Sequence, residues 1–335
     1  MTHPTFAQNN RQKRQQRSMV SHVIRILTVA CSLLFLTACS GSTNTDIHSD
    51  KSIETETADS SEEAARLRVV ASFYPMYDFA VKIGGDKANV LCMVPSGTEP
   101  HDWEPSASDI AALENADLFL YHGAGLEHWI DSVLGTLTNP NLVILEASDG
   151  IPLRTGGTDE TGSQDPHVWL NPRYAKLELE HIRNAYIEAD PDNKAYYDAN
   201  YALYAGQFDE LDHLFSDTLT PLSRKDIVVS HEAFGYLCDA YGLNQIAIDG
   251  LSPDSEPGPA RMAEIIDFVR DNNVSAIFFE ELGSSKTAET IAAETGVETL
   301  VLNPLEGITD EEQRAGKDYF SIMKDNLAAL TEALK

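Results

Sequence analysis

From Leu67 onward, short runs of apolar residues alternate with longer amphipathic segments of helical period. Short apolar strands separated by helices are typical of parallel sheets, because two parallel strands must be joined by a crossover connection. The alternation occurs in two halves, so we predict an α/β fold with two parallel-sheet βα lobes. The predicted strands are 67–72, 90–95, 118–121 and 142–146 in the first lobe and 227–230, 245–249, 276–280 and 299–302 in the second. The predicted helices are 75–83, 106–115, 126–134, 233–241, 259–271, 285–295 and 311–334.

A long helix is predicted between the two halves, over residues 191–219. Its apolar residues step alternately by four and three, which marks one face of a helix about 40 Å long. A rigid helical connector would limit how far the lobes swing, although the same stripe would also suit a core helix of one lobe. The predicted first lobe is therefore 67–190 and the second 220–335. The stripe consists of Tyr197, Tyr201, Tyr204, Phe208, Leu211 and Phe215.

The first 38 residues have the order of a secretory signal peptide. A basic stretch from Arg11 to Arg25 precedes an uncharged apolar run over 26–38, which ends in small residues. The run is shorter than the roughly 20 residues that a membrane-spanning helix needs. Met19 is an alternative start, because Arg25 alone would leave a short basic region. Residues 39–66 are rich in Ser, Thr, Asp and Glu, which predicts a disordered acidic spacer.

The signal ends in Leu-Thr-Ala-Cys, which resembles a bacterial lipobox. The resemblance implies cleavage before Cys39 and a lipid on its sulfur. We therefore expect a protein anchored by lipid at the extracytoplasmic face of the bacterial cell membrane.

The chain is strongly acidic, with a formal net charge of -29, and the signal itself contains no acid. Such a chain repels nucleic-acid phosphates, so no nucleic-acid partner is expected. An acidic surface can draw cations inward, but it equally serves solubility, and charge alone does not indicate a metal site. Two cysteines remain after Cys39. Cys92 lies in a predicted strand of one half and Cys238 in a predicted helix of the other, which favours two separate buried thiols over a disulfide.

Three histidines and one glutamate each follow a predicted strand. His101 follows the second strand of the first lobe and His167 the fourth, whereas His231 and Glu306 follow the first and last strands of the second lobe. Ligands in α/β sheets bind outside the carboxyl ends of strands, so facing lobes would bring all four together in the cleft between them. Imidazole and carboxylate suit Zn²⁺, and four protein ligands close a tetrahedral shell. A closed shell leaves no position for an activated water, so we expect no enzyme activity.

Several acids could support the histidines. Asp102, Asp165, Glu232 and Glu280 are candidates to accept the second imidazole N–H of a metal-binding histidine. Capping of a helix end is the alternative role for the first three.

The fourth ligand has alternatives. Glu280 and Glu281 end a strand and rival Glu306, and a water could also fill the position. His122 follows the third strand and could line the cleft, but we favour a role other than ligation.

These segments resemble the zinc-specific solute-binding lipoproteins of ABC transporters, in the group that includes laminin-binding lipoproteins. The likeness extends from about Leu67 to the end of the chain. It implies that His101, His167 and His231 bind the metal, and that Glu306 of the Asn-Pro-Leu-Glu segment completes the shell. It also implies two α/β lobes bridged by a long helix, with the metal between them.

Two further comparisons refine the resemblance. Manganese relatives typically have an acid in place of His231 and an aspartate near Glu306, so His231 favours zinc. Many zinc relatives carry a histidine-rich loop before the second histidine, whereas residues 154–164 of this chain contain no histidine. A metal-gathering role for that loop is therefore not expected.

The resulting hypothesis is a monomeric protein that binds extracytoplasmic Zn²⁺ and delivers it to an integral-membrane ABC permease with a cytoplasmic ATPase. Manganese or iron transport is the nearest alternative. A second alternative is a surface adhesin for an extracellular-matrix protein such as laminin. Adhesion that persists in the absence of metal would distinguish this function from metal transport. A third alternative is a zinc hydrolase, which would be indicated by substrate turnover that the substitution Glu306→Gln abolishes.

Overall fold

Each half of the chain forms a four-stranded parallel sheet. The computed structural model describes residues 66–156, 163–252 and 257–335. The first sheet has the order β2-β1-β3-β4 and the second the order β6-β5-β7-β8, and every neighbouring pair is parallel. This confirms the predicted α/β fold with two parallel sheets. The strands are β1 (Leu67–Ala71), β2 (Ala88–Cys92), β3 (Leu118–Tyr121), β4 (Val143–Glu146), β5 (Asp226–Val229), β6 (Asn244–Ala247), β7 (Ala276–Phe279) and β8 (Glu298–Val301).

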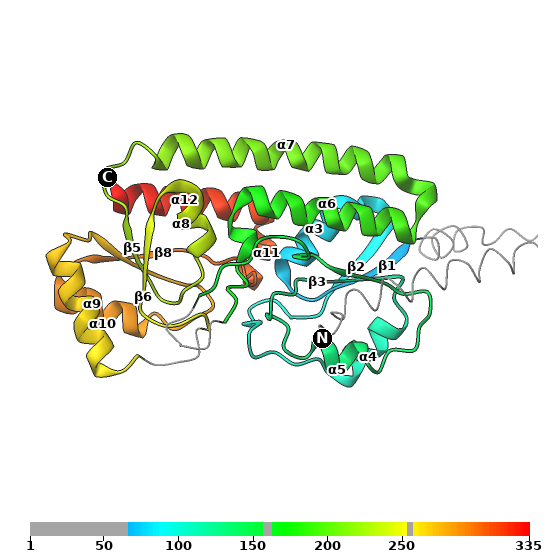
Figure 1. The fold of residues 1–335 in the computed structure, drawn as a ribbon, viewed down its shortest axis with the longest axis horizontal. Coiled ribbons are helices and arrows are strands. Elements are labelled where there is room, and N and C mark those ends of the chain that lie inside the picture. The colour runs from blue at the N-terminus through cyan, green and yellow to red at the C-terminus, as the bar shows by residue number, and fades with distance from the viewer. Residues whose placement is uncertain (1–65, 157–162, 253–256) are drawn as a thin grey trace, which may run out of the picture. The chain divides into compact units, whose positions relative to one another are not determined.

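Helices cover both faces of each sheet (Figure 1). In the first lobe, α3 and α6 lie on one face of the sheet and α4 and α5 on the other. In the second lobe, α8 and α12 lie on one face and α9 and α10 on the other. The helices are α3 (Tyr74–Gly84), α4 (Ala107–Glu114), α5 (Ile130–Leu134), α6 (Pro172–Ala189), α7 (Lys194–Leu219), α8 (Gly235–Tyr241), α9 (Pro259–Asp271), α10 (Lys286–Thr295), α11 (Asp310–Arg314) and α12 (Tyr319–Leu334).

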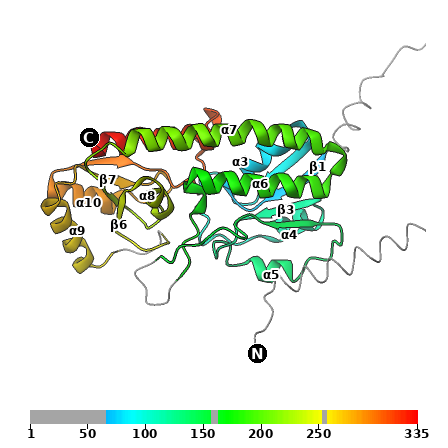
Figure 2. The same cartoon turned by 45° about the horizontal axis from the view of Figure 1, so that its top comes forward.

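The long helix α7 runs along both lobes, as the two ribbon views show (Figures 1 and 2). The predicted apolar face of α7 is the face that packs against the core. Four residues of the stripe are buried: Tyr197, Phe208, Leu211 and Phe215. The other two tyrosines of the stripe are partly buried against the same core. That core is continuous from β1 of the first lobe to β5 of the second. The seam between the lobes is therefore filled with apolar side chains beneath α7.

Phe208 of α7 is fully buried among aromatic rings, so truncating it should destabilise the protein. Its ring centroid lies 5.6 Å from that of Phe79, 5.2 Å from Tyr319 and 4.8 Å from Phe320. Phe208→Ala is expected to lower the free energy of unfolding by about 3–5 kcal/mol, measured by urea denaturation. Leu203→Ala is the control, because Leu203 lies on the same helix but is 58% exposed. This substitution should change the free energy of unfolding by less than about 0.5 kcal/mol. Equal effects of the two substitutions would contradict this packing.

Two predicted helices differ from the structure, and the bounds of a third helix were not predicted. No bounds were predicted for α6, although its buried residues Ala175, Leu179, Ile182 and Tyr186 step by four, three and four. The predicted helix 126–134 begins only at Ile130, because the Glu127 carboxylate instead accepts backbone N–H groups of the preceding turn.

The predicted helix 311–334 is two helices. Gly316 adopts a φ of 70°, which ends α11, and the Asp318 side chain accepts the N–H of Ser321 to begin α12.

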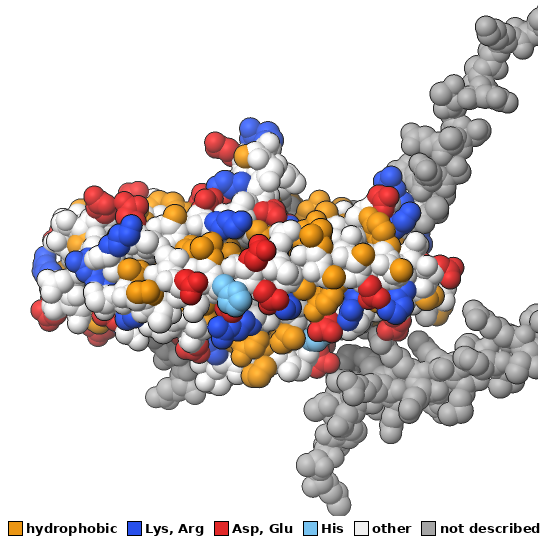
Figure 3. All heavy atoms as spheres, turned by 90° about the horizontal axis from the view of Figure 1, so that it is seen from above, with side chains coloured by type: hydrophobic (Ala, Val, Ile, Leu, Met, Phe, Trp, Pro, Cys, Tyr) orange, Lys and Arg blue, Asp and Glu red, His pale blue; other side chains and the backbone are white. Residues whose placement is uncertain are grey.

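The surface above α7 intermixes acidic, basic and apolar side chains (Figure 3). Among the described residues, none of the helices combines the length and apolar character needed to cross a bilayer. Cys92 and Cys238 are free thiols, as predicted. The predicted signal 1–38, Cys39 and nearly all of the spacer 39–66 lie outside the described residues.

Candidate metal centre

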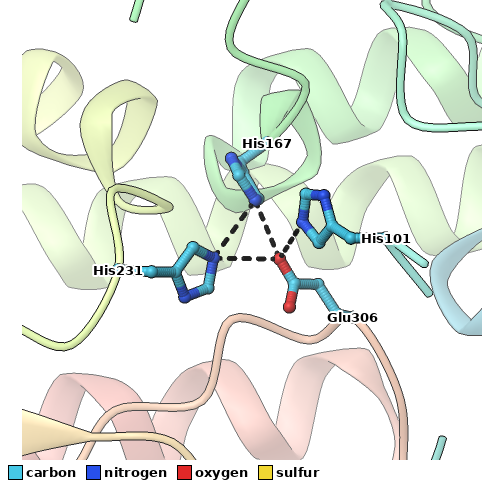
Figure 4. A group of neighbouring side chains, drawn as sticks. All are labelled: His101, His167, His231 and Glu306. Carbon is cyan, nitrogen blue, oxygen red and sulfur yellow. Dashed lines mark hydrogen bonds and ion pairs between the residues drawn. The ribbon is translucent and has the colours of Figure 1, made fainter. Parts of the chain in front are cut away.

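Four loops at the carboxyl ends of strands bring three histidines and one glutamate together between the lobes. The three imidazole rings and the Glu306 carboxylate point toward one another (Figure 4). Glu306 Oε1 lies 3.2 Å from the Nε2 atom of His101, 2.8 Å from that of His167 and 3.2 Å from that of His231. The Nε2 atoms of His167 and His231 are 3.4 Å apart. The four residues that the sequence singled out therefore meet at one point.

The spacing of these atoms fits a tetrahedral ion. One ligand atom from each of the four residues lies within 4.8 Å of every other. A tetrahedron with metal–ligand bonds of about 2.0 Å has edges of about 3.3 Å. The four distances above, from 2.8 to 3.4 Å, are close to that edge length. A zinc ion could thus be held with small side-chain adjustments.

Two of the histidines are oriented by buried carboxylates. His167 donates its Nδ1–H to Asp165 Oδ1 over 2.8 Å, and His231 donates its Nδ1–H to Glu280 Oε1 over 2.6 Å. Each carboxylate favours the tautomer that leaves Nε2 as a lone-pair donor facing the centre. Two of the four predicted supporting acids, Asp165 and Glu280, therefore lie where they can accept an imidazole N–H. Asp102 is exposed and Glu232 half-buried, and their roles stay predictions.

Glu306, and neither of its rivals Glu280 and Glu281, belongs to the converging group of side chains. Glu280 lies behind the His231 ring, on its Nδ1 side. Glu281 contacts Asn303 at 3.1 Å, and burial together with the neighbouring Glu312 raises the pKa of Glu281 to about 7. Neither belongs to the group of converging ligand atoms among the described residues.

The segment that carries Glu306 is a tight, buried turn. Leu305 adopts a φ of 60°, which is uncommon for a bulky residue and costs about 1–3 kcal/mol. Two hydrogen bonds hold the turn: Leu305 N–H donates to Asn303 Oδ1 over 2.7 Å, and the Asn326 amide donates to Asn303 O over 2.7 Å. Trp169 Nε1 also donates to Pro304 O over 2.8 Å, joining this turn to the loop of His167. The strained backbone thus aims the Glu306 carboxylate at the histidines.

The buried carboxylates shift the pKa values of two of the histidines, and the histidines shift that of Glu306. Burial disfavours a charged imidazole, but Asp165 and Glu306 outweigh it and raise the pKa of His167. Glu280 and Glu306 likewise raise the pKa of His231 well above its ordinary value. Burial would raise the pKa of Glu306, but His231 and His101 hold it well below its usual range.

His122 lies outside the group of four, consistent with the predicted role other than ligation. Its ring is fully buried, with Nε2 2.6 Å from Pro166 O and Nδ1 2.8 Å from the equally buried Glu178. Burial opposes a charge on His122, yet the ion pair with Glu178 gives a net rise in its pKa. Glu178 lies on α6, whose bounds were not predicted, and the sequence alone did not single it out. The apolar spacing of α6 is the signal that could have found this helix.

Comparisons with known proteins place the chain among zinc-binding proteins. Residues 69–333 match the family described as "Zinc-uptake complex component A periplasmic". The "High-affinity zinc uptake system protein ZnuA" of Bacillus subtilis is 40% identical over 92% of this chain and 97% of its own length. The "Zinc-binding lipoprotein AdcA" of Streptococcus pneumoniae is 38% identical over 92% of this chain, which spans only 60% of that relative.

Two solved structures share the fold closely. The Zn(II)-bound ZnuA-like domain of Streptococcus pneumoniae AdcA has a TM-score of 0.72 at 40% identity, covering 80% of this chain and 99% of that one. The laminin-binding protein of Streptococcus agalactiae, titled a bifunctional protein with adhesin and metal-transporting activity, has a TM-score of 0.72 at 34% identity. That match covers 80% of this chain and all of the other.

Proposed function

The chain belongs to the zinc-uptake complex component A family, and from this premise we propose that it binds Zn²⁺ through His101, His167, His231 and Glu306. The observation that carries the assignment of ligands is the convergence of three Nε2 atoms and one carboxylate oxygen at distances near a tetrahedron edge. Neutral imidazoles and a carboxylate are ligands that zinc prefers. Zn²⁺ is the cargo of this site.

The site is built to hold an ion rather than to activate a water. Four protein ligands would fill the tetrahedral shell of zinc, whereas a catalytic zinc keeps one position open. We therefore expect no hydrolytic turnover.

A protein of this family acts outside the cytoplasm, and the partner we propose is an integral-membrane ABC permease that is driven by a cytoplasmic ATPase. The lipobox-like segment supports attachment through a lipid on Cys39. We propose that the protein acts as a monomer, which size-exclusion chromatography with light scattering would test.

Titration of metals into the purified full-length protein tests the proposed function. Isothermal titration with Zn²⁺ in the presence of a competing chelator should give one tight site per chain. Mn²⁺ and Fe²⁺ should not displace the bound Zn²⁺ at equal concentration, since both lie at the weak-binding end of the affinity order of the divalent first-row metals. A chain that binds no zinc, or that releases it to equimolar Mn²⁺, would contradict the proposal.

Adhesion to laminin is a second candidate function, favoured by the 34% identity to the laminin-binding protein of Streptococcus agalactiae. Zinc capture ranks first because it has a defined site in this chain. Binding of the purified protein to immobilised laminin, measured with and without a chelator, separates the two. Adhesion that persists after the metal is removed would establish a surface independent of the site.

A further inference from the structure

A short antiparallel ribbon of the first lobe meets helix α8 of the second lobe beside the metal centre. The ribbon pairs Thr155 with Gln164, and Asp165 N–H donates to Arg154 O over 3.0 Å. It belongs to the segment in which zinc relatives often carry histidines and this chain carries none. In this chain the ribbon residues Arg154 and Asp165 contact helix α8 of the second lobe. These contacts indicate a role in holding the lobes together rather than in gathering metal.

One buried hydroxyl joins the ribbon to the second lobe. Tyr236 of α8 is 2% exposed. Its hydroxyl accepts the backbone N–H of Arg154 over 2.8 Å and donates to the backbone carbonyl of Asp165 over 2.8 Å. The hydroxyl of this second-lobe residue thus acts both as donor and as acceptor, and both partners belong to the first lobe. Removing it would take away the partner of a partly buried N–H and of a buried carbonyl.

The Arg154 side chain crosses the same boundary. Its guanidinium forms an ion pair with Asp239 of α8 and lies 5.8 Å from the centroid of the Tyr236 ring. Its Nε is 3.5 Å from Asp165 Oδ2, on the far side of the carboxylate that accepts the His167 imidazole N–H. One carboxylate therefore connects the contact between the lobes to a metal-binding imidazole.

Gly235 makes this close approach possible. A Cβ atom at this position would stand 2.7 Å from Arg154 Nε and 2.9 Å from Asp165 Oδ2. Its φ is not in the left-handed region, so alanine would be acceptable to the backbone and would favour the helix. The absence of a side chain at Gly235 thus serves the contact rather than the conformation.

We propose that Arg154, Asp165, Tyr236 and Asp239 form an interlobe clasp that keeps His167 and His231 at metal-binding distance before the ion arrives. Tyr236 lies five residues after His231, and Asp165 two residues before His167. The clasp therefore joins the segments that carry two ligands from opposite lobes. Its residues are positioning residues: they act through Asp165 and the lobe boundary and do not touch the ion. This inference rests on the proposed zinc site and adds to it the control of zinc release.

The test compares two tyrosines that each lose one buried hydroxyl. Tyr236→Phe removes the clasp bonds. Tyr186→Phe is the matched control, because its fully buried hydroxyl donates to Ala80 O over 2.9 Å within the first lobe. Full-length proteins loaded with zinc are mixed with a chromogenic chelator in a stopped-flow instrument, and thermal unfolding is recorded in parallel. We expect Tyr236→Phe to release zinc about tenfold faster than wild type. Tyr186→Phe should match the wild-type release rate even where its melting temperature falls.

Gly235→Ala provides an independent variant that keeps the hydroxyl. It favours helix α8 but pushes the guanidinium away from Asp165, so it should also accelerate zinc release. Small-angle scattering of the metal-free proteins should give a larger radius of gyration for both clasp variants than for wild type.

Wild-type release rates in both clasp variants would overturn the clasp while leaving the metal site intact. Equal acceleration by Tyr186→Phe would assign the effect to general stability and overturn it as well. Failure of wild type itself to bind zinc would instead contradict the proposed function.

Discussion

His167→Ala is expected to weaken zinc binding by more than about 100-fold, because the loss of a ligand should exceed the 10–100-fold typical of losing a supporting partner. The His167 ring is fully buried, and its Nε2 atom lies within 3.4 Å of two other candidate ligand atoms. Its removal would also leave the Asp165 carboxylate without the imidazole N–H that it accepts. Competition titration with a chelator of known zinc affinity measures the effect.

Two further variants give this experiment a graded scale. Asp165→Asn should lower zinc affinity by the 10–100-fold of a supporting partner, since it weakens the hydrogen bond to His167 but keeps the ligand. His128→Ala is the histidine control, because that side chain is 48% exposed and outside the group, and it should leave the affinity unchanged. If His167→Ala bound zinc as tightly as His128→Ala, the metal would be bound elsewhere.

Zinc affinity should fall steeply with decreasing pH, and the fall should begin above pH 6.5. An unperturbed histidine has a pKa of about 6.5, and that value alone predicts a loss of affinity near it. The buried carboxylates raise the pKa values of His167 and His231, so protons compete with zinc at higher pH than they would for isolated imidazoles. The lowered pKa of Glu306 keeps that carboxylate ionised, so it adds no pH dependence in this range.

The direction and the steepness of this pH dependence of zinc affinity can be measured together. Each of these two imidazoles that carries a proton before binding loses it when zinc binds. The dissociation constant should therefore rise by up to about two decades for each unit by which the pH falls. Titrations in buffers of different ionisation enthalpy report the number of protons released. A dissociation constant that stays flat between pH 6 and 7.5 would show that the histidines are already neutral and would contradict the raised pKa values.

The architecture was predictable because it depends on local patterns. Alternation of short apolar runs with segments of helical period places the strands near their observed positions. The alternating four- and three-residue spacing of apolar residues identifies α7. The errors arise where a single side chain overrides the pattern. Glu127 uses its carboxylate on the backbone and delays α5, and Gly316 with Asp318 interrupts an otherwise continuous helical period.

The candidate ligands were predictable from topology, since each follows a strand and parallel strands in facing lobes end at a shared edge. Their orientation was predictable only in part: Asp165 and Glu280 were among the four candidate supporting acids, but which histidine each one contacts depends on how the fold packs. Glu280 reaches His231 from 49 residues away, and the hydroxyl of Tyr236 reaches Asp165 across 71. In the sequence alone, Tyr236 has only the pattern of a buried helix residue.

The four side chains of the metal centre are unequally covered. His167 and His231 are fully buried and Glu306 is 2% exposed, whereas the His101 side chain retains 12% of its exposure and lies in the long loop after β2. With zinc bound as proposed, an incoming competitor for the ion would reach His101 first and could displace that single imidazole while the other three ligands stay in place. Exchange would then pass through a mixed complex, with a rate that increases with the concentration of the competitor.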